Sequence, residues 1–243
     1  MTQMQANFAS AAAAIRRFDA IMPLDDDAIA ALHEAARRPR RVSAHHELLT
    51  EGAAISEPHI LLNGWGARVR ILPDGRRQIL SLLLPGDMLG HCYQPQPLAI
   101  TSVVALTAID LCPAPSTEEV QSLRHVYAIS HALEEAFLLA QITRLGRMSA
   151  YERLADLFLE LLERLSLSGN AQHNAFDHPL TQELVADVTG LTPVHVNRVV
   201  KRLRHRDEAD WHTGYLTLRD PDALRRRIGR TPFQISQAMR RRA

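Results

Sequence analysis

The sequence has few cysteines, few aromatic residues and no long apolar run. Its 243 residues contain two cysteines, Cys92 and Cys112, which excludes the disulfide framework of small secreted domains. The two do not form a Cys-x-x-Cys pair, so the sequence does not indicate a zinc site. No apolar stretch reaches the roughly 20 residues that span a bilayer, and the first 20 residues lack the order of a signal peptide. We therefore expect a cytoplasmic protein that does not associate with membranes.

Motifs of the common enzyme classes are missing as well. The chain has no P-loop, no dinucleotide-binding fingerprint, no nucleophile elbow and no HExxH. Scattered His and Asp residues without such spacing do not indicate a catalytic site, so we predict no enzymatic activity. The length leaves room for two domains, and 46% hydrophobic with 23% charged residues is typical of a folded globular protein.

Charge is divided unevenly along the chain. Residues 179–243 contain 13 Lys and Arg against 7 Asp and Glu, a net charge of +6, whereas residues 1–178 carry a net −5. A basic C-terminal part next to an acidic body is typical of nucleic-acid-binding proteins, although basic faces are often simply solvated.

Residues 179–204 predict two short helices joined by a tight turn. Thr181 can cap the first helix, and Gly190 stands where the chain must turn. Thr192 can cap the second helix, with Pro193 at its first position, where the missing N–H costs nothing. This punctuation is typical of a helix-turn-helix.

The second helix has an apolar face and a polar face at 100° per residue. The first consists of Val196, Val199, Val200 and Leu203, and the second of Val194, Asn197, Arg198 and Lys201. An exposed helix tip with an amide, a guanidinium and an ammonium suits the DNA major groove. Two other interpretations stay open, a solvated helical hairpin and a helix-turn-helix that binds another protein.

The segment GLTPVHVNR resembles the helix-turn-helix of the Crp/Fnr family of bacterial transcription regulators. The resemblance implies a recognition helix over residues 193–202. Arg198 is then the best candidate for bidentate contact with guanine, Asn197 reads adenine or holds a phosphate, and Val194 meets a thymine methyl where several relatives carry Glu. The DNA-contacting residues implied are Thr181, Gln182, Thr192, Pro193, Val194, His195, Asn197, Arg198, Lys201 and Arg202.

Residues 42–113 show short apolar runs separated by turns, and Asp74-Gly75 between two of them predicts a β-hairpin. Such a series makes a small antiparallel barrel or β-roll. The turn glycines resemble those of the Crp/Fnr sensor domain, which shares its fold with cyclic-nucleotide-binding domains; they are Gly52, Gly64, Gly75, Gly86 and Gly90.

The resemblance departs from the family pattern in the ligand-binding segment. His91 follows Gly90 where cyclic-AMP-binding members have Glu, and Ala99-Ile100 fall where they have Arg and Ser. A cyclic phosphate needs a cation and donors, so we predict no cyclic-AMP binding. Two cysteines are too few for an iron–sulfur cluster, whereas His91-Cys92 leaves haem open. The effector pocket is expected at Leu89, His91, Cys92 and Tyr93; no cofactor is assigned.

A long helix is predicted over residues 116–147, with apolar residues at intervals of three and four. The stripe consists of Val126, Ile129, Leu133, Phe137 and Ala140. Such a stripe can lie on the sheet, but the resemblance implies that this helix pairs with its copy in a homodimer of coiled-coil type.

The remaining segments complete the predicted α+β architecture. Helices are expected near residues 8–15 and 25–38, and 166–178 is expected to be a loop with His173 and His178 exposed. Asp207 and Glu208 replace the Gly-Leu that relatives have before the wing hairpin at Thr213-Gly214, so a looser helix end is expected. Two clusters that can touch phosphates are 225–227 and 240–242, both Arg-Arg-Arg.

The predicted domains are a β-roll sensor with N-terminal helices (1–115), a dimerisation helix and hinge (116–148), a winged helix-turn-helix (149–228) and a basic tail (229–243). The function implied is a homodimeric bacterial transcription regulator that binds an inverted-repeat operator without cyclic AMP, with RNA polymerase as a further partner. The alternatives are an effector-sensing or scaffold protein whose helix-turn-helix contacts proteins, and a haem-based gas sensor.

Overall fold

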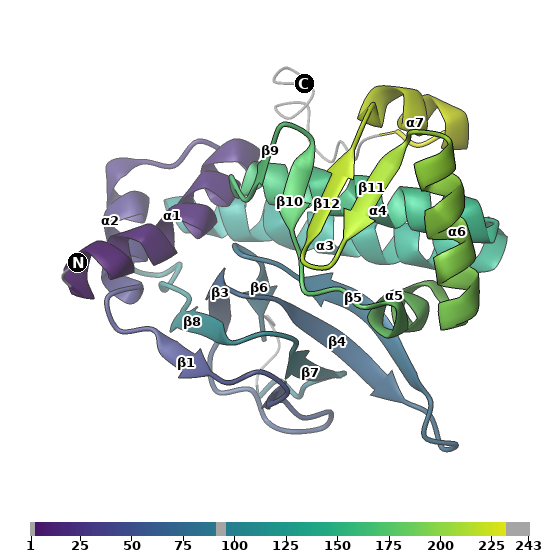
Figure 1. The fold of residues 1–243 in the computed structure, drawn as a ribbon. Coiled ribbons are helices and arrows are strands. Elements are labelled where there is room, and N and C mark those ends of the chain that lie inside the picture. Colours follow the sequence, from purple (N-terminus) through teal and green to yellow (C-terminus); the bar gives the residue numbers. More distant parts are fainter. Residues whose placement is uncertain (1–2, 91–95, 232–243) are drawn as a thin grey trace. The chain divides into compact units, whose positions relative to one another are not determined.

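The structure is a computed structural model that describes residues 3–90 and 96–231. These residues form two compact units, one made of 3–69, 82–90 and 96–135 and the other of 70–81 and 136–231 (Figure 1). Among the residues described, no helix is both long enough and apolar enough to cross a membrane.

The first unit begins with two helices, α1 (Gln3–Ile21) and α2 (Asp26–Ala35). The Asp25 side chain caps α2 by accepting a hydrogen bond from the Ala28 N–H at 2.8 Å, as its position after Pro23 predicts. Arg17 joins α1 to the turn at residues 85–87, because it is 4% exposed and lies 2.9 Å from the Asp87 carboxylate. Gly86 permits this contact, because a Cβ there would lie 2.6 Å from Arg17 Cδ.

Eight strands form two antiparallel sheets of the predicted β-roll. One sheet has the order β1 (Arg40–Val42), β8 (Ile109–Pro113), β3 (His59–Asn63), β6 (Met88–Leu89). The other has the order β2 (Glu47–Leu49), β7 (Ser102–Ala105), β4 (Gly66–Ile71), β5 (Arg77–Leu83). The hairpin predicted at Asp74-Gly75 is confirmed, since β4 and β5 are neighbours. Their inward side chains form the core, which includes Leu61, Leu83, Val103, Ile109 and Leu111.

The long helix α3 runs from Ser122 to Arg147 and therefore starts later than predicted. Residues 116–121 make turns instead, because the Ser116 hydroxyl accepts from the Glu118 N–H and Val120 bonds back to Ser116. The division between the two units falls within α3, after residue 135.

The second unit contains α4 (Ala150–Leu167), α5 (Gln182–Thr189), α6 (Pro193–His205) and α7 (Pro221–Ile228). Ser149 and Glu152 close the start of α4 with a capping box. A four-stranded antiparallel sheet has the order β11 (Ala209–His212), β12 (Tyr215–Leu218), β10 (Ala175–Asp177), β9 (Ala171–Gln172). The predicted wing hairpin at Thr213-Gly214 is confirmed as β11–β12.

The prediction that residues 166–178 form a loop is wrong. The helix α4 continues to Leu167, and β9 and β10 then form a hairpin whose turn residues, His173 and Asn174, have φ of 50° and 62°. His173 is exposed as expected, but His178 is 5% exposed and packs edge-on against Phe176 and Trp211. The pairing of β10 with β12 draws this histidine into the core.

Buried charges connect α3, α4 and Arg230, which is the second residue after α7. Arg144 of α3 is 2% exposed and lies 2.6 Å from Asp156 and 2.5 Å from Glu160, both on α4. Asp156 also pairs with Arg230, which lies 2.8 Å from Glu163. Since each buried carboxylate has a cationic partner, the pairs avoid the large cost of an unpaired buried charge.

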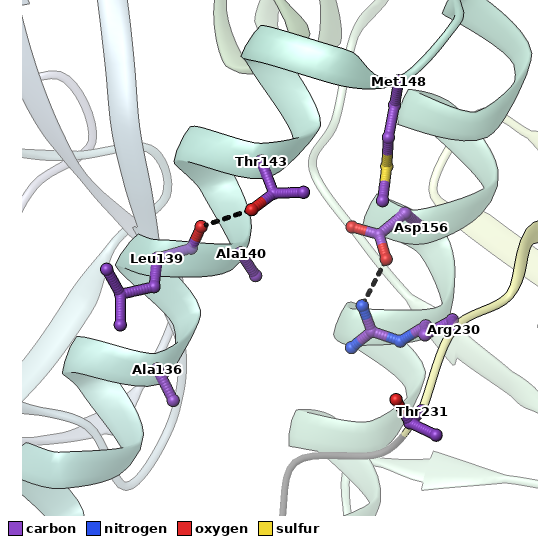
Figure 2. A pocket seen from close by; sticks show the side chains of 8 residues that line it. All are labelled: Ala136, Leu139, Ala140, Thr143, Met148, Asp156, Arg230 and Thr231. Atoms are coloured by element: carbon purple, nitrogen blue, oxygen red, sulfur yellow. Dashed lines mark hydrogen bonds and ion pairs between the residues drawn. The ribbon is translucent and has the colours of Figure 1, made fainter.

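A groove of about 330 Å³ lies beside this network (Figure 2). Ala136 and Ala140 of α3 point into it, while Leu139 points away from Asp156 and Arg230. The residues that line it are Ala136, Leu139, Ala140, Thr143, Met148, Asp156, Arg230 and Thr231. The groove is largely apolar, and the ion pair between Asp156 and Arg230 lies at its side.

Candidate nucleic-acid interface

The helices α5 and α6 are set by their caps and by the turn between them. The hydroxyls of Thr181 and Thr192 accept from the N–H groups of Leu184 at 3.2 Å and His195 at 3.3 Å, so both predicted N-caps are confirmed. Gly190 has φ of +64°, a left-handed conformation that favours glycine, and ends α5.

Arg153 of α4 fixes this turn to the rest of the unit. Its guanidinium donates to the carbonyls of Leu145, Met148 and Thr189, each at 2.9 Å. The Gln141 amide of α3 donates to the Val188 carbonyl at 2.6 Å. The end of α5 is thus bonded to α3 and α4, which holds the start of α6 in place.

The helix α6 has the two faces that its spacing predicts. Val196 and Leu203 are completely buried, whereas Val194 is 68% exposed, and Arg198 and Lys201 are exposed too. No acidic residue occurs in α6, which carries four Arg and Lys. Within the described part of the chain, neither Arg198 nor Lys201 makes a hydrogen bond or ion pair, so both cations are free to meet an anionic or acceptor-rich partner.

Asn197 is held by a residue from the other helix. Its Nδ2 donates to Oε1 of Gln182, the first residue of α5, at 3.3 Å. Both side chains are half-buried. Both are predicted DNA-contacting residues. Their contact could not be predicted from the sequence, because 15 positions separate them and no local pattern relates them.

The Tyr151 ring of α4 packs against two guanidinium groups at the end of α6. The guanidinium carbons of Arg202 and Arg206 lie 4.8 Å and 5.5 Å from its ring centroid, within cation–π range. Its hydroxyl donates to Glu208 at 2.6 Å, and the other Glu208 oxygen pairs with Arg227. Burial raises the pKa of Tyr151, and its bond to Glu208 adds to this. Arg202 is therefore a stacked side chain as well as a predicted DNA contact.

Family comparisons cover both parts of the chain. Residues 152–227 match the Crp-like helix-turn-helix domain, and residues 39–123 match the cyclic nucleotide-binding domain. The nitrogen fixation regulation protein FixK of Bradyrhizobium diazoefficiens is 31% identical over 201 residues, which cover 79% of this chain and 83% of FixK. The chain belongs to the Crp/Fnr family of transcriptional regulators.

Further relatives agree with this assignment. The transcriptional activator protein FnrL of Cereibacter sphaeroides is 30% identical over 189 residues, 74% of this chain and 75% of FnrL. The solved structure of FixK2 from Bradyrhizobium japonicum matches with a TM-score of 0.66 and 25% identity, covering 78% of this chain and 96% of that one. This Crp/Fnr protein is therefore a DNA-binding transcription regulator, and the family is non-enzymatic.

The end of α6 is closed, whereas the sequence predicts a looser helix end. Asp207 takes the left-handed conformation with φ of 54°, but the end is closed, because the N–H groups of Asp207 and Glu208 bond back to Arg204 and Leu203. Tyr215 is 45% exposed on the wing. His212 lies 3.0 Å from Asp210 and holds the pKa of that carboxyl below its usual value.

Two of the arginines in the predicted phosphate-binding cluster at 225–227 are engaged inside the regulator. Arg225 pairs with Glu163 and Asp222, and Arg227 pairs with Glu208. Arg226 is exposed. The second cluster, 240–242, lies outside the described residues.

Of the four residues predicted to line the effector pocket, the structure describes Leu89. Leu89 is 3% exposed and belongs to the β-roll core; His91, Cys92 and Tyr93 lie outside the described residues. Ala99 is buried and Ile100 is 81% exposed; these are the two residues that the resemblance matches to the Arg and Ser of cyclic-AMP-binding members. Cys112 is buried, and burial raises its pKa to about 12, so its thiol is not a reactive group.

The predicted dimer stripe on α3 needs correction. Val126, Leu133 and Phe137 are 1%, 2% and 9% exposed within a single chain, and Phe137 lies under the Arg164 guanidinium at 4.8 Å. Ile129 and Ala140 are half-buried. The three buried residues of this stripe therefore pack inside the regulator. The sequence does not reveal this, because α3 has apolar residues on two faces and a period of three and four does not tell which face is internal.

The exposed apolar residues of α3 lie on a different face. Leu139 is 58% exposed and Ile142 is 67% exposed. Exposed positions follow one another at intervals of four and three; they are Ala128, Ala132, Glu135, Leu139, Ile142 and Gly146. We name this set the α3 seam.

Proposed function

We propose that this regulator binds an inverted-repeat operator as a homodimer, with one α6 in each of two successive major grooves. The observation that carries this proposal is the division of α6, which buries Val196 and Leu203 and leaves Val194, Arg198 and Lys201 facing outward. Because two-fold related helices read two half-sites, the half-site centres are about 34 to 36 Å apart.

Each exposed side chain of α6 has a role that follows from its chemistry. Arg198 presents a planar fork of donors that matches O6 and N7 of guanine, the commonest base-specific contact. Val194 contacts a thymine methyl. The phosphate contacts are the helix caps Thr181 and Thr192 together with His195, Lys201 and Arg202 of α6. The N-terminus of α6 at Pro193 lies close to the DNA backbone.

The α3 seam is the proposed dimer contact. Its spacing alternates four and three, which is the heptad pattern of a coiled coil. Ala128, Ala132 and Gly146 are small and let two helices approach closely, while Leu139 and Ile142 supply the apolar area. The 26 residues of α3 correspond to a length of about 39 Å, enough for several turns of contact.

We propose that binding does not require cyclic AMP. Ala99 and Ile100 offer neither a cation nor a hydroxyl where a cyclic phosphate needs both. A relative described as the CRP-like cAMP-activated global transcriptional regulator of Mycobacterium tuberculosis is 26% identical over 219 residues. We therefore propose that this chain and that relative differ in their response to cyclic AMP although they are similar in sequence. The proposed setting is the bacterial cytoplasm, with RNA polymerase as the partner on which the bound dimer acts.

Selection of bound duplexes from a random pool tests the proposal. The full chain, incubated with and without cyclic AMP, should enrich the same inverted repeat in both cases, and sedimentation velocity should show a dimer. Leu139→Asp should shift the dimer toward monomer and reduce operator binding, whereas Ile71→Asp, a matched change at a 70% exposed apolar residue outside α3, should not. Enrichment of an asymmetric site, a monomer that binds equally well, or enrichment only with cyclic AMP would contradict it.

A further inference from the structure

The contact between Gln182 and Asn197 is not explained by the proposed function alone. It joins the first residue of α5 to the middle of the outward face of α6, with Asn197 Nδ2 donating to Gln182 Oε1 at 3.3 Å. A short amide on an exposed helix face normally turns freely about its last torsion. Here the neighbouring helix holds it in one orientation.

The contact fixes which hydrogen-bonding groups Asn197 has left. A side-chain amide has two N–H donors and one acceptor oxygen. One N–H is taken by Gln182, so one N–H and Oδ1 remain for a base edge. Asn197 therefore presents one donor beside one acceptor.

This remaining pair matches a single base in the major groove. Adenine offers the N7 acceptor and the N6 donor, which is the complement of one N–H and one oxygen. Guanine offers two acceptors, O6 and N7, and would leave the Asn197 oxygen facing another acceptor. Since a buried unpaired acceptor is costly, the fixed amide selects adenine.

We propose that Gln182 is a specificity-determining residue that orients Asn197 to read adenine in each half-site. The proposal rests on the operator binding proposed above and adds one base and one positioning residue to it. Val194, one turn before Asn197 and 68% exposed, offers no competing hydrogen bond. Arg198 is the next residue after Asn197, so its guanine falls at a neighbouring base pair.

The competing interpretation is that Gln182 only touches the phosphate backbone. As the first residue of α5, it is placed like many backbone contacts of helix-turn-helix proteins. A backbone contact weakens all sequences alike, whereas a positioning residue changes the preference at one base pair. The two interpretations therefore differ in a measurable way.

The experiment uses the full chain and its own selected operator, with every base pair of one half-site varied in turn. Asn197→Ala should lose the preference for adenine at one base pair, by roughly fivefold to a hundredfold. Gln182→Ala should lose preference at that same base pair, and the double variant should lose no more than Asn197→Ala. Arg198→Ala should affect a different base pair.

Gln182→Glu is the matched control. Its carboxylate keeps the acceptor for Asn197 Nδ2 but adds a negative charge near DNA, so overall affinity should fall while the adenine preference stays. Circular dichroism checks that each variant folds. If Gln182→Ala weakens all sequences equally and keeps the preference, Gln182 does not position Asn197. A guanine at the Asn197 base pair overturns the assigned amide orientation. Failure of the wild-type chain to select any inverted repeat would instead reject the proposed function itself.

Discussion

The Tyr151 hydroxyl donates to the Glu208 carboxylate at 2.6 Å and so joins α4 to the segment that follows α6. Glu208 is 8% exposed, and its other oxygen pairs with Arg227. The same Tyr151 ring supports Arg202 and Arg206. One side chain thus closes the end of α6 and positions two of its cations.

Two substitutions separate these roles of Tyr151. Tyr151→Phe keeps the ring and removes the bond to Glu208, which should lower the free energy of unfolding by about 1 to 2 kcal/mol. Tyr151→Leu also removes the aromatic ring and should in addition reduce the steepness with which DNA binding falls with salt, because Arg202 and Arg206 lose their placement. Urea unfolding and salt titrations measure both. Equal salt dependence in Leu and Phe variants would show that the stacking does not serve DNA binding.

Asp207 is a site where a glycine should stabilise the protein. Its φ of 54° lies in the left-handed region, which glycine adopts without steric cost. Its ion pair with Arg219 at 3.5 Å is exposed and contributes little. We expect Asp207→Gly to raise the free energy of unfolding by about 0.5 to 1 kcal/mol, and Asp207→Ala to lower it. Thermal unfolding of the two variants checks the opposite signs.

His178 should make the DNA-binding unit sensitive to mild acid. Burial lowers the pKa of His178 from 6.5 to about 4, so between these values the unfolded chain binds a proton that the folded chain does not. The contribution is fully present above pH 6.5 and is lost as pH falls toward 4, by up to about 3 kcal/mol. The groups around the ring are Phe176, Trp211 and the backbone of Leu180 and Tyr215, with Asp177 next to it in sequence.

His178→Asn tests this pH dependence, because its amide oxygen can still accept from the Leu180 N–H. The slope of stability against pH between 4 and 6.5 should flatten in the variant. An unchanged slope would assign the acid sensitivity to other groups.

Removal of Arg144 should be the most destabilising single change in the second unit. Arg144→Met leaves Asp156 and Glu160 with one buried cation fewer and should cost about 3 to 5 kcal/mol. Arg226→Gln is the control, since Arg226 is exposed and should change stability by less than about 0.5 kcal/mol. Urea unfolding curves measure the difference, and similar small changes in both variants would mean that the network stabilises nothing.

Local chemistry made much of the fold predictable. The caps Asp25, Thr181 and Thr192 act through atoms within three residues, so sequence alone could place the helix starts. The faces of α6 follow from its period for the same reason. The hairpin after α4 was missed because its turn consists of His173 and Asn174, which are not glycine and still adopt positive φ.

Long-range contacts were the part that sequence could not supply. Tyr151 and Glu208 are separated by 57 positions, and Gln182 and Asn197 by 15, so no local pattern relates them. The α3 stripe was assigned to the wrong contact because the helix has two apolar faces, and only packing shows that Val126 and Leu133 face inward.

The central claim is that α6 reads DNA through its outward face, and the affinities of Arg198→Ala and Lys201→Ala for a panel of single-base operator variants test it most directly. Arg198→Ala should cost about 1 to 3 kcal/mol and remove the preference at one base pair in each half-site. Lys201→Ala should weaken all sequences alike and reduce the salt slope by about one. The account is contradicted if both variants lose affinity without any change of base preference, or if neither loses any.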